Sequence, residues 1–108
     1  ARLSALSVLV FAGPLRLTEL ARIEQVKPPT MTKVIAGLEA AGLVRRRNDV
    51  KDARAVRLEA TARGTRLLQE GRRRRVERLA SALQPLASDE LDMLARAAAI
   101  IERISARI

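Results

Sequence analysis

The segment KPPTMTKVIAGLEAAGLV, residues 27–44, restricts the possible folds more than any other part of this sequence. Pro28 or Pro29 fits the first turn of a helix, where a missing backbone N–H costs little, and Gly42 fits the position that ends one. Between them, apolar side chains recur with helical spacing at Met31, Val34, Ile35 and Leu38. We therefore predict a helix over residues 28–41 whose apolar side chains belong to the core.

A shorter helix is predicted just before it, over residues 18–25. Thr18 is a favourable N-cap, and the charge of Glu19 in the first turn suits the helix dipole. The brief turn between the two helices is typical of a helix-turn-helix. Further upstream, LSALSVLVFA at residues 3–12 fits a buried helix or a strand equally well, and it stops at a Gly-Pro pair.

Two short strands around a polar loop follow the longer helix. Leu43 and Val44 lead into three arginines, and beyond the loop NDVKDAR the residues of AVRLEAT alternate between apolar and charged. Such segments around a loop with Asn and Asp predict a β-hairpin. Because side chains alternate along a strand, the arginines at 45–47 cannot all face the same side.

Two further helices complete the predicted chain. Thr61 is placed to cap the first, which extends toward Pro85, and Ser88 is placed to cap the second. The last helix carries an apolar stripe with approximately heptad spacing, which requires a partner helix. The stripe comprises Leu91, Leu94, Ala98, Ile101, Ile104 and Ile108.

Positive charge is concentrated in the hairpin and in the segment after it. The chain has 21 Lys and Arg against 12 Asp and Glu, a net charge of +9, and 13 basic against five acidic residues lie between positions 45 and 78. This excess indicates a polyanionic partner. Four arginines at 72–75 spread around a helix, so they cannot serve one surface together. For them we expect solvent exposure or salt bridges with Glu70 and Glu77, with auxiliary phosphate contact as the alternative.

Missing residue types exclude several kinds of site. The chain has no Cys, and therefore no disulfide and no thiolate metal site. It has no His, Tyr or Trp, and Phe11 is its single aromatic residue, which argues against histidine-based catalysis and against aromatic platforms for single-stranded nucleic acid. No apolar run is long enough to cross a bilayer. We expect a cytoplasmic protein that is not an enzyme, needs no cofactor and binds no membrane.

Residues 13–64 resemble the MarR family, the multiple antibiotic resistance regulators. The matching features are Leu-Ala at 20–21, Pro-Thr-x-Thr-basic at 29–33, Leu-Glu-x-x-Gly-Leu-Val at 38–44, Asp-x-x-Asp-x-Arg at 49–54 and Thr-x-x-Gly at 61–64. The sequence departs from the family pattern at Lys27, Ala53 and Ala60, where the family has a small N-capping residue, a second basic residue and Leu. A long helix usually precedes the segment equivalent to residues 3–12, and we expect it to be absent from this chain.

The resemblance implies a mainly α fold with a small β-hairpin (α+β). A winged helix-turn-helix DNA-binding lobe would occupy residues 1–64, and long dimerisation helices would occupy residues 65–108. The six-residue apolar stripe of the last helix would then form the dimer contact.

By the same resemblance, the helix at about 28–41 is the recognition helix and enters the major groove of double-stranded DNA. Thr30 and Thr32 are placed to bond phosphates or base edges, and Lys33 to reach a phosphate or a guanine. Pro29 stiffens the start of the helix and can contact thymine methyl groups.

The hairpin at about 43–60 is the wing. Arg47, Lys51 and Arg54 are expected to contact the DNA backbone or the minor groove. Asp52 does not favour DNA by its charge, so we expect it to orient Arg54 or another arginine through a charge-assisted bond.

The implied function is that of a dimeric, sequence-specific DNA-binding repressor. A two-fold dimer would place two recognition helices on a pseudo-palindromic operator with half-sites about 10 base pairs apart, and a small anionic or phenolic effector would release the DNA. The alternative is a basic helical interaction or architectural protein that binds RNA or an acidic partner. Charge concentrated in a hairpin beside a helix-turn-helix favours the first interpretation.

Overall fold

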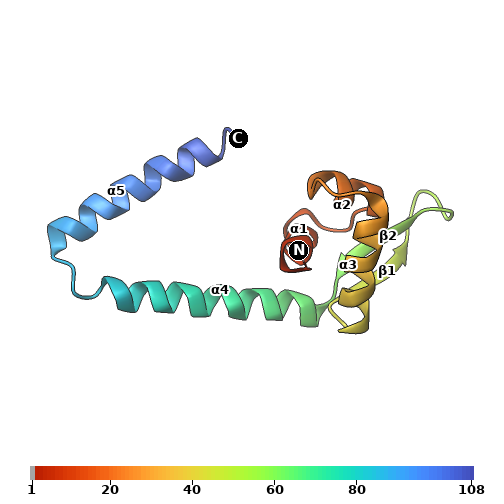
Figure 1. Cartoon of the computed structure of the whole chain (residues 1–108), viewed down its shortest axis with the longest axis horizontal. Coiled ribbons are helices and arrows are strands. Elements are labelled where there is room, and N and C mark those ends of the chain that lie inside the picture. The colour runs from red at the N-terminus through yellow and green to blue at the C-terminus, as the bar shows by residue number, and fades with distance from the viewer. Residues whose placement is uncertain (1) are drawn as a thin grey trace. The chain divides into compact units, whose positions relative to one another are not determined.

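Five helices and one two-stranded antiparallel sheet make up residues 2–108, the part of the chain that the computed structural model describes (Figure 1). In chain order they are α1 (Arg2–Ala12), α2 (Leu17–Ile23), α3 (Pro28–Ala40), β1 (Val44–Asn48), β2 (Val56–Ala60), α4 (Ala62–Leu83) and α5 (Ser88–Ser105). The predicted mainly α fold with a small hairpin is confirmed. The apolar block near the start of the sequence, for which the pattern left helix and strand open, is helix α1.

The chain forms two compact units, one ending at Arg72 and the other spanning Arg73–Ile108. We call them the N-terminal lobe and the C-terminal unit. The boundary falls inside α4, so the first turns of this helix belong to the N-terminal lobe. The division into a DNA-binding region and a dimerisation region after residue 64 stays a prediction.

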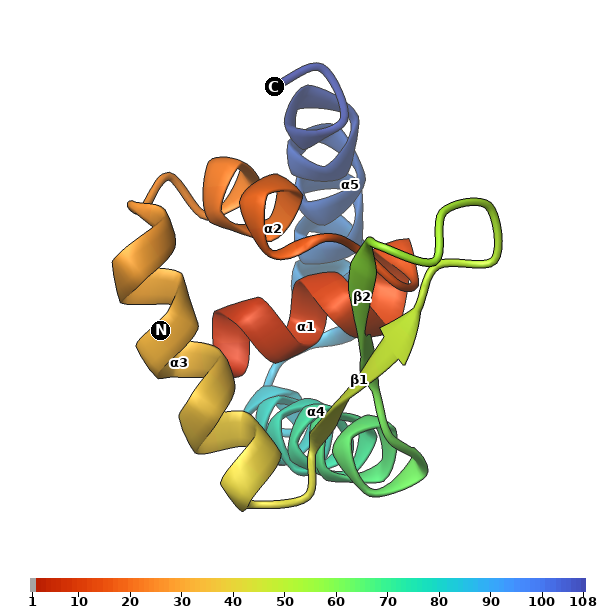
Figure 2. The same cartoon turned by 90° about the vertical axis from the view of Figure 1, so that its right-hand side faces the viewer.

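The core of the N-terminal lobe lies where α1 packs against α3 and β2 (Figure 2). Its largest fully buried side chains come from α1, α2, α3 and β2; they are Leu6, Leu9, Leu20, Met31, Ile35 and Leu58. Burying a side chain of this size contributes about 1.5–3 kcal/mol. The helical spacing read from α3 is confirmed, because Leu38 is also buried and Val34 packs against the core.

Helix α2 begins one residue earlier than the sequence suggested. The predicted N-cap Thr18 is wrong, because Arg16 occupies that position and its backbone N–H donates to Oε1 of Glu19 at 3.0 Å. The reason lies in the preceding residue. Leu15 exchanges two backbone hydrogen bonds with Leu58 of β2, of 3.0 and 2.7 Å, which hold it in an extended conformation up to the start of the helix.

The turn between α2 and α3 contains Gln25 with a left-handed φ of 58°. The N–H of Gln25 donates to Arg22 O, and the N–H of Val26 donates to Ala21 O. Helices that end with this pair of bonds usually have glycine where Gln25 stands. A Cβ in this conformation is unfavourable. We expect Gln25→Gly to raise the free energy of unfolding by about 0.5–1 kcal/mol. The gain is smaller than the strain that is relieved, because glycine also has more conformational freedom in the unfolded chain.

Urea titration of the 108-residue chain measures this effect. Ala41→Gly is the matched control, because Ala41 ends α3 with an ordinary φ of −82° and gains nothing from glycine. The control is expected to destabilise the lobe. Equal losses for the two variants would contradict the strain at Gln25.

Helix α3 ends as predicted at Gly42, which has a φ of 74°. The N–H of Gly42 donates to Glu39 O and the N–H of Leu43 donates to Leu38 O, both at 2.9 Å. These bonds satisfy carbonyls at the helix end and reverse the chain into the wing. In the wing, Val44 pairs with Ala60 and Asn48 pairs with Val56 in antiparallel register.

The peptide after this turn joins the wing to α4. The carbonyl of Leu43 accepts the N–H of Thr61 at 2.9 Å, and the Thr61 hydroxyl donates to Gly42 O at 2.7 Å. Thr61 is the N-cap that the sequence predicted, since its Oγ1 also accepts the N–H of Gly64 at 3.1 Å. Gly64 is buried, and a methyl group there would meet the Leu43 carbonyl and the Leu6 side chain. The end of α3, the return of the wing and the start of α4 therefore meet at one peptide group.

Helix α5 of the C-terminal unit also begins one residue before the expected position. The predicted N-cap Ser88 is wrong, because Ala87 is the N-cap and Ser88 is the first helical residue. Glu90 accounts for the difference: its Oε1 accepts the backbone N–H of Ala87 at 3.0 Å, which fixes the start of the helix there. Glu90 and Asp89 lie in the first turn of the helix.

Candidate nucleic-acid interface

The exposed start of α3 carries the residues predicted to read DNA. Pro29, Thr30, Thr32 and Lys33 are all exposed, and Lys33 forms no ion pair within residues 2–108. Because the two residues that open the helix are prolines, they have no N–H to offer. The N–H of Thr30 donates to no backbone carbonyl in the described part of the chain, which leaves one amide to meet an anion at this helix start.

The Thr32 hydroxyl is partly used by the helix itself. It donates to the carbonyl oxygen of Pro28 at 3.0 Å. The oxygen remains an acceptor, and its lone pairs suit an amino group on a base edge better than a phosphate oxygen. Among the residues at this surface, Lys33 therefore offers positive charge, Thr30 offers an amide and a hydroxyl, and Thr32 offers an acceptor.

The tip of the wing is shaped by two aspartates that bond to the backbone. Oδ1 of Asp49 accepts the N–H of Lys51 at 2.9 Å, and Oδ1 of Asp52 accepts the N–H of Arg54 at 3.0 Å. Lys51 and Arg54 are exposed and form no ion pair within residues 2–108. Asp52 is next to Arg54 as expected, but the structure corrects its partner: the carboxylate binds the backbone amide and not the guanidinium. Short-range geometry causes this, since an Asp side chain readily reaches the amide two residues on.

Asp49 also links the wing to the segment before α2. It is buried, and its Oδ2 accepts bonds from Arg57 Nε at 2.9 Å and Arg16 Nη2 at 3.3 Å. The Lys51 amide and then the Arg57 guanidinium hold the pKa of Asp49 at about 2, so its carboxylate is ionised at neutral pH. Arg57 Nη1 also donates to the Pro14 carbonyl at 3.2 Å. The sequence placed Asp49 in the wing pattern without revealing these contacts.

The three arginines of β1 divide between the two faces of the hairpin, as strand alternation requires. Arg45 and Arg47 both bind Glu59 of β2, the latter through Nη1 to Oε2 at 3.3 Å. Arg46 is on the other face and binds Glu39 of α3, with Nε at 3.0 and 3.2 Å from the two carboxylate oxygens. All three arginines are paired with carboxylates, unlike Lys51 and Arg54 at the tip.

Sequence reasoning missed these partners of the arginines, Glu39 and Glu59. Arg45 and Glu59 are directly opposite each other across the hairpin. Opposite charges at such cross-strand positions attract one another. The signal was therefore present, but using it requires the register of the two strands.

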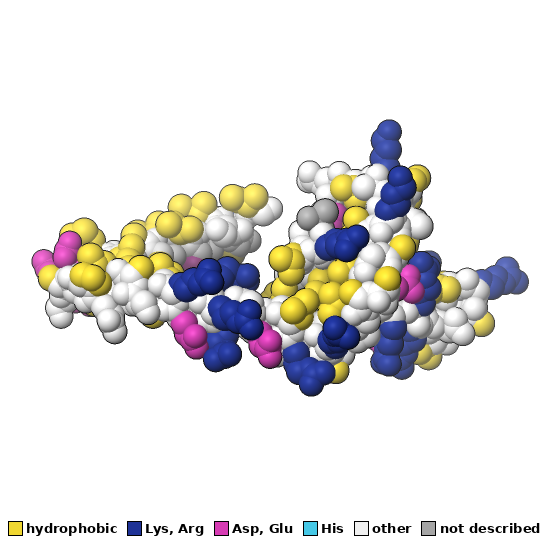
Figure 3. All heavy atoms as spheres, turned by 60° about the horizontal axis from the view of Figure 1, so that its bottom comes forward, with side chains coloured by type: hydrophobic (Ala, Val, Ile, Leu, Met, Phe, Trp, Pro, Cys, Tyr) yellow, Lys and Arg dark blue, Asp and Glu magenta, His cyan; other side chains and the backbone are white. Residues whose placement is uncertain are grey.

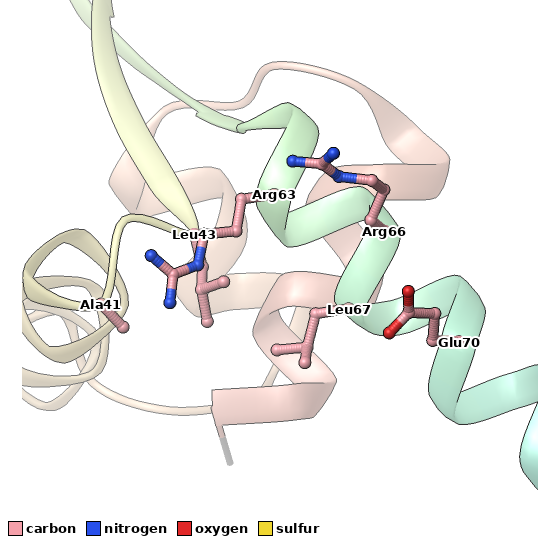
Figure 4. Close-up of a pocket in the computed structure, with 6 residues that line it drawn as sticks. All are labelled: Ala41, Leu43, Arg63, Arg66, Leu67 and Glu70. Atoms are coloured by element: carbon pink, nitrogen blue, oxygen red, sulfur yellow. The ribbon is translucent and has the colours of Figure 1, made fainter.

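Figure 4 shows a shallow pocket of about 460 Å³ beside the first turns of α4. Ala41 and Leu43, from the end of α3 and the turn after it, and Leu67 from α4 give it an apolar lining. Arg63, Arg66 and Glu70 of α4 add charged groups, and neither arginine forms an ion pair within residues 2–108. The pocket therefore combines apolar surface with unpaired positive charge.

The C-terminal unit exposes its hydrophobic side chains, a band of which is visible in Figure 3. Every residue of the predicted apolar stripe is exposed, and α5 has no buried residue. Ile101 is 63% exposed and Ile104 is 56% exposed. In the arginine run at 72–75, Arg73 binds Glu77 at 3.3 Å, one of the two salt-bridge partners that the sequence suggested.

Two kinds of feature are absent from residues 2–108. No helix there is long and apolar enough to cross a membrane. No group of three or more acidic residues there is arranged to hold a metal ion.

The chain is similar to known proteins in sequence and in fold. The model of the MarR family matches residues 1–56. An uncharacterised HTH-type transcriptional regulator from Mycobacterium leprae is 40% identical over 100 residues, which are 93% of this chain and 70% of that protein. The YusO protein from Bacillus subtilis is 28% identical, with a TM-score of 0.82 over 94% of this chain and 72% of that one.

The fold is also that of a MepR mutant from S. aureus bound to an oligodeoxyribonucleotide. This protein is 20% identical, with a TM-score of 0.75 over 99% of this chain and 78% of that one. The sequence relative and the family model both describe transcriptional regulators and not enzymes. The match to half of the sequence and the 40% identity over nearly all of it show that this chain belongs to the MarR family of transcriptional regulators.

Proposed function

We propose that the chain is a dimeric repressor that binds double-stranded DNA at a specific pseudo-palindromic site and is released by a small ligand. The observation that carries the proposal is the pairing pattern of the basic residues. The hairpin arginines at 45–47 and Arg57 bind carboxylates, whereas Lys33, Lys51 and Arg54 are exposed without one. Within the recognition helix and the wing, these three are the basic residues that have no carboxylate partner.

Specific reading is proposed for the first turns of α3. Pro29, Thr30, Thr32 and Lys33 would face base edges and phosphates in the major groove, while Lys51 and Arg54 reach the backbone or the minor groove beside it. Asp52 would shape the tip that carries them. The MepR mutant bound to an oligodeoxyribonucleotide, which shares this fold, supports DNA as the partner.

Dimerisation is proposed through α5. Leu91, Leu94, Ala98, Ile101, Ile104 and Ile108 form its stripe. A helix with an uncovered apolar face of this kind is stabilised by burying that face against another helix. A second copy of the chain provides such a helix, and two-fold symmetry brings two recognition helices to one operator.

Release by a small ligand is proposed at the pocket beside α4. Arg63 and Arg66 supply positive charge for a carboxylate or phenolate, and Leu43 and Leu67 supply apolar contact for a ring. A ligand there would touch α4 and the turn that ends α3. Differential binding to one arrangement of these elements would bias the recognition helix away from its DNA-binding position.

Selection from a random duplex pool, followed by fluorescence anisotropy, tests the proposal. We expect recovery of a palindromic site, binding that weakens steeply with salt, and a dimer of the 11.9 kDa chain in sedimentation equilibrium. Equal affinity for the selected and scrambled duplexes at physiological salt would reject specific recognition. Stronger binding to duplex RNA would favour the alternative of an architectural or interaction protein.

A further inference from the structure

The outer face of the wing carries a carboxylate held between two arginines. In the antiparallel register, Arg45 is opposite Glu59 and Arg47 is opposite Arg57. Residues directly opposite each other share a face, so these four side chains lie on one side of the hairpin. The other side carries Val44 and Leu58, which are buried in the core. The Arg45–Glu59–Arg47 group thus lies on the side of the hairpin away from the core.

Glu59 is nearly buried although it lies on the outer face of the wing. Only 8% of the residue is exposed, whereas the side chains of Arg45 and Arg47 are 65% and 59% exposed. One carboxylate oxygen accepts from Arg45 and the other from Arg47, so both are occupied. The bond from Arg45 outweighs the burial and holds the pKa of Glu59 below its usual value. The acid therefore stays ionised and cancels one of the two positive charges.

We propose that Glu59 determines specificity by restraining Arg45 and Arg47, so that they add little to sequence-independent attraction for DNA. The inference rests on the proposed function. A phosphate approaching either guanidinium also approaches the carboxylate bound to it, which repels the phosphate. A neutral amide in place of the Glu59 carboxylate could orient the arginines toward a phosphate without repelling it. The negative charge of Glu59 therefore fits restraint of the arginines better than their orientation for phosphate.

Restraint of this kind affects non-specific complexes more than the specific one. A duplex held only by its phosphates takes many orientations on the protein, including those that face the outer side of the wing. A duplex held by base contacts from α3 takes one orientation. Extra positive charge on the outer face therefore favours the non-specific complexes more than the specific one. The ratio of specific to non-specific affinity falls as a result.

The test is Glu59→Gln in the full chain, measured by anisotropy on the selected site and on a scrambled duplex over a range of salt concentrations. Each additional phosphate contact makes the slope of log affinity against log salt steeper by about 0.9. We expect affinity for the scrambled duplex to rise about five- to tenfold at 0.1–0.2 M salt. Affinity for the selected site is expected to change less, so that the specificity ratio falls.

Two further variants establish the cause. In a background with Arg45→Gln and Arg47→Gln, the effect of Glu59→Gln should disappear, because no restrained cation remains to be released. Glu102→Gln removes one negative charge from α5 and should leave the ratio unchanged. Glu59→Thr, a residue that favours strands, serves if the glutamine variant does not fold.

Each outcome decides the matter. Unchanged or weaker binding of Glu59→Gln to the scrambled duplex would overturn the restraint, and so would a rise that persists without the two arginines or appears equally in Glu102→Gln. Failure of the unaltered chain to bind any duplex would instead reject the proposed function. The two failures are therefore distinguishable in the same set of titrations.

Discussion

Replacement of Gly64 by Ala is expected to lower the free energy of unfolding by about 3 kcal/mol. The added methyl group would overlap the backbone carbonyl of Leu43 and press on Cδ1 of Leu6 at 3.1 Å. Neither neighbour moves easily, because the same carbonyl accepts the N–H of Thr61 and Leu6 is fully buried. Relief requires the start of α4 to withdraw from the wing, which breaks the contacts around Thr61.

Urea denaturation followed by circular dichroism measures the loss at Gly64. Gly37→Ala is the matched control, since it makes the same change within a helix but meets only the end of the Arg2 side chain, with Cζ at 2.6 Å. A flexible guanidinium can move aside, and alanine favours the helix, so the control is expected to be neutral or stabilising. Similar stabilities for the two variants would show that Leu43 and Gly64 do not approach as closely as described.

Arg54→Ala is expected to weaken binding to the selected duplex about 10- to 100-fold while leaving the proposed dimer intact. Arg54 is exposed at the tip of the wing and has no carboxylate partner within residues 2–108. Its free guanidinium suits the negative potential of a narrow minor groove. Truncation removes that contact without disturbing the core, because the backbone N–H that binds Asp52 remains.

Arg54→Lys separates the effect of charge from that of shape at this position, and Arg96→Ala is the control for net charge. Arg54→Lys keeps the charge but loses the planar group, and it is expected to recover only part of the affinity. Arg96→Ala removes one positive charge from α5 and should change affinity little. Anisotropy gives the dissociation constants, and sedimentation gives the assembly state. Unchanged affinity of Arg54→Ala would remove the wing tip from the proposed interface.

The elements bounded by strong backbone signals were predictable from sequence. Prolines and Gly42 delimit α3 because each has a conformational property that few other residues share. The two N-caps were misplaced because Thr18 and Ser88 are good caps in isolation, whereas Glu19 and Glu90 accept the N–H groups of Arg16 and Ala87. In both cases a carboxylate three residues on determines where the helix starts.

The candidate interface was only partly predictable for a different reason. Residue types identified which positions are basic, but exposure alone does not make a cation available to DNA. Arg47 was expected to contact DNA, and its guanidinium is bound to Glu59 in the free protein. Arg46 likewise binds Glu39, which is seven residues away in the sequence and on another element. Such pairings depend on register and packing, which a single sequence does not specify.

The paired backbone bonds between Leu15 and Leu58 tie the start of α2 to the wing, and the Leu43 peptide ties the wing to the end of α3. Under the proposed mode of binding, these ties give the recognition helix and the base of the wing a nearly fixed separation. The lobe would then bind best to duplexes in which the distance between a major groove and its neighbouring minor groove matches this separation. Operators with the right bases but altered twist would bind weakly, because the wing base does not move independently to compensate.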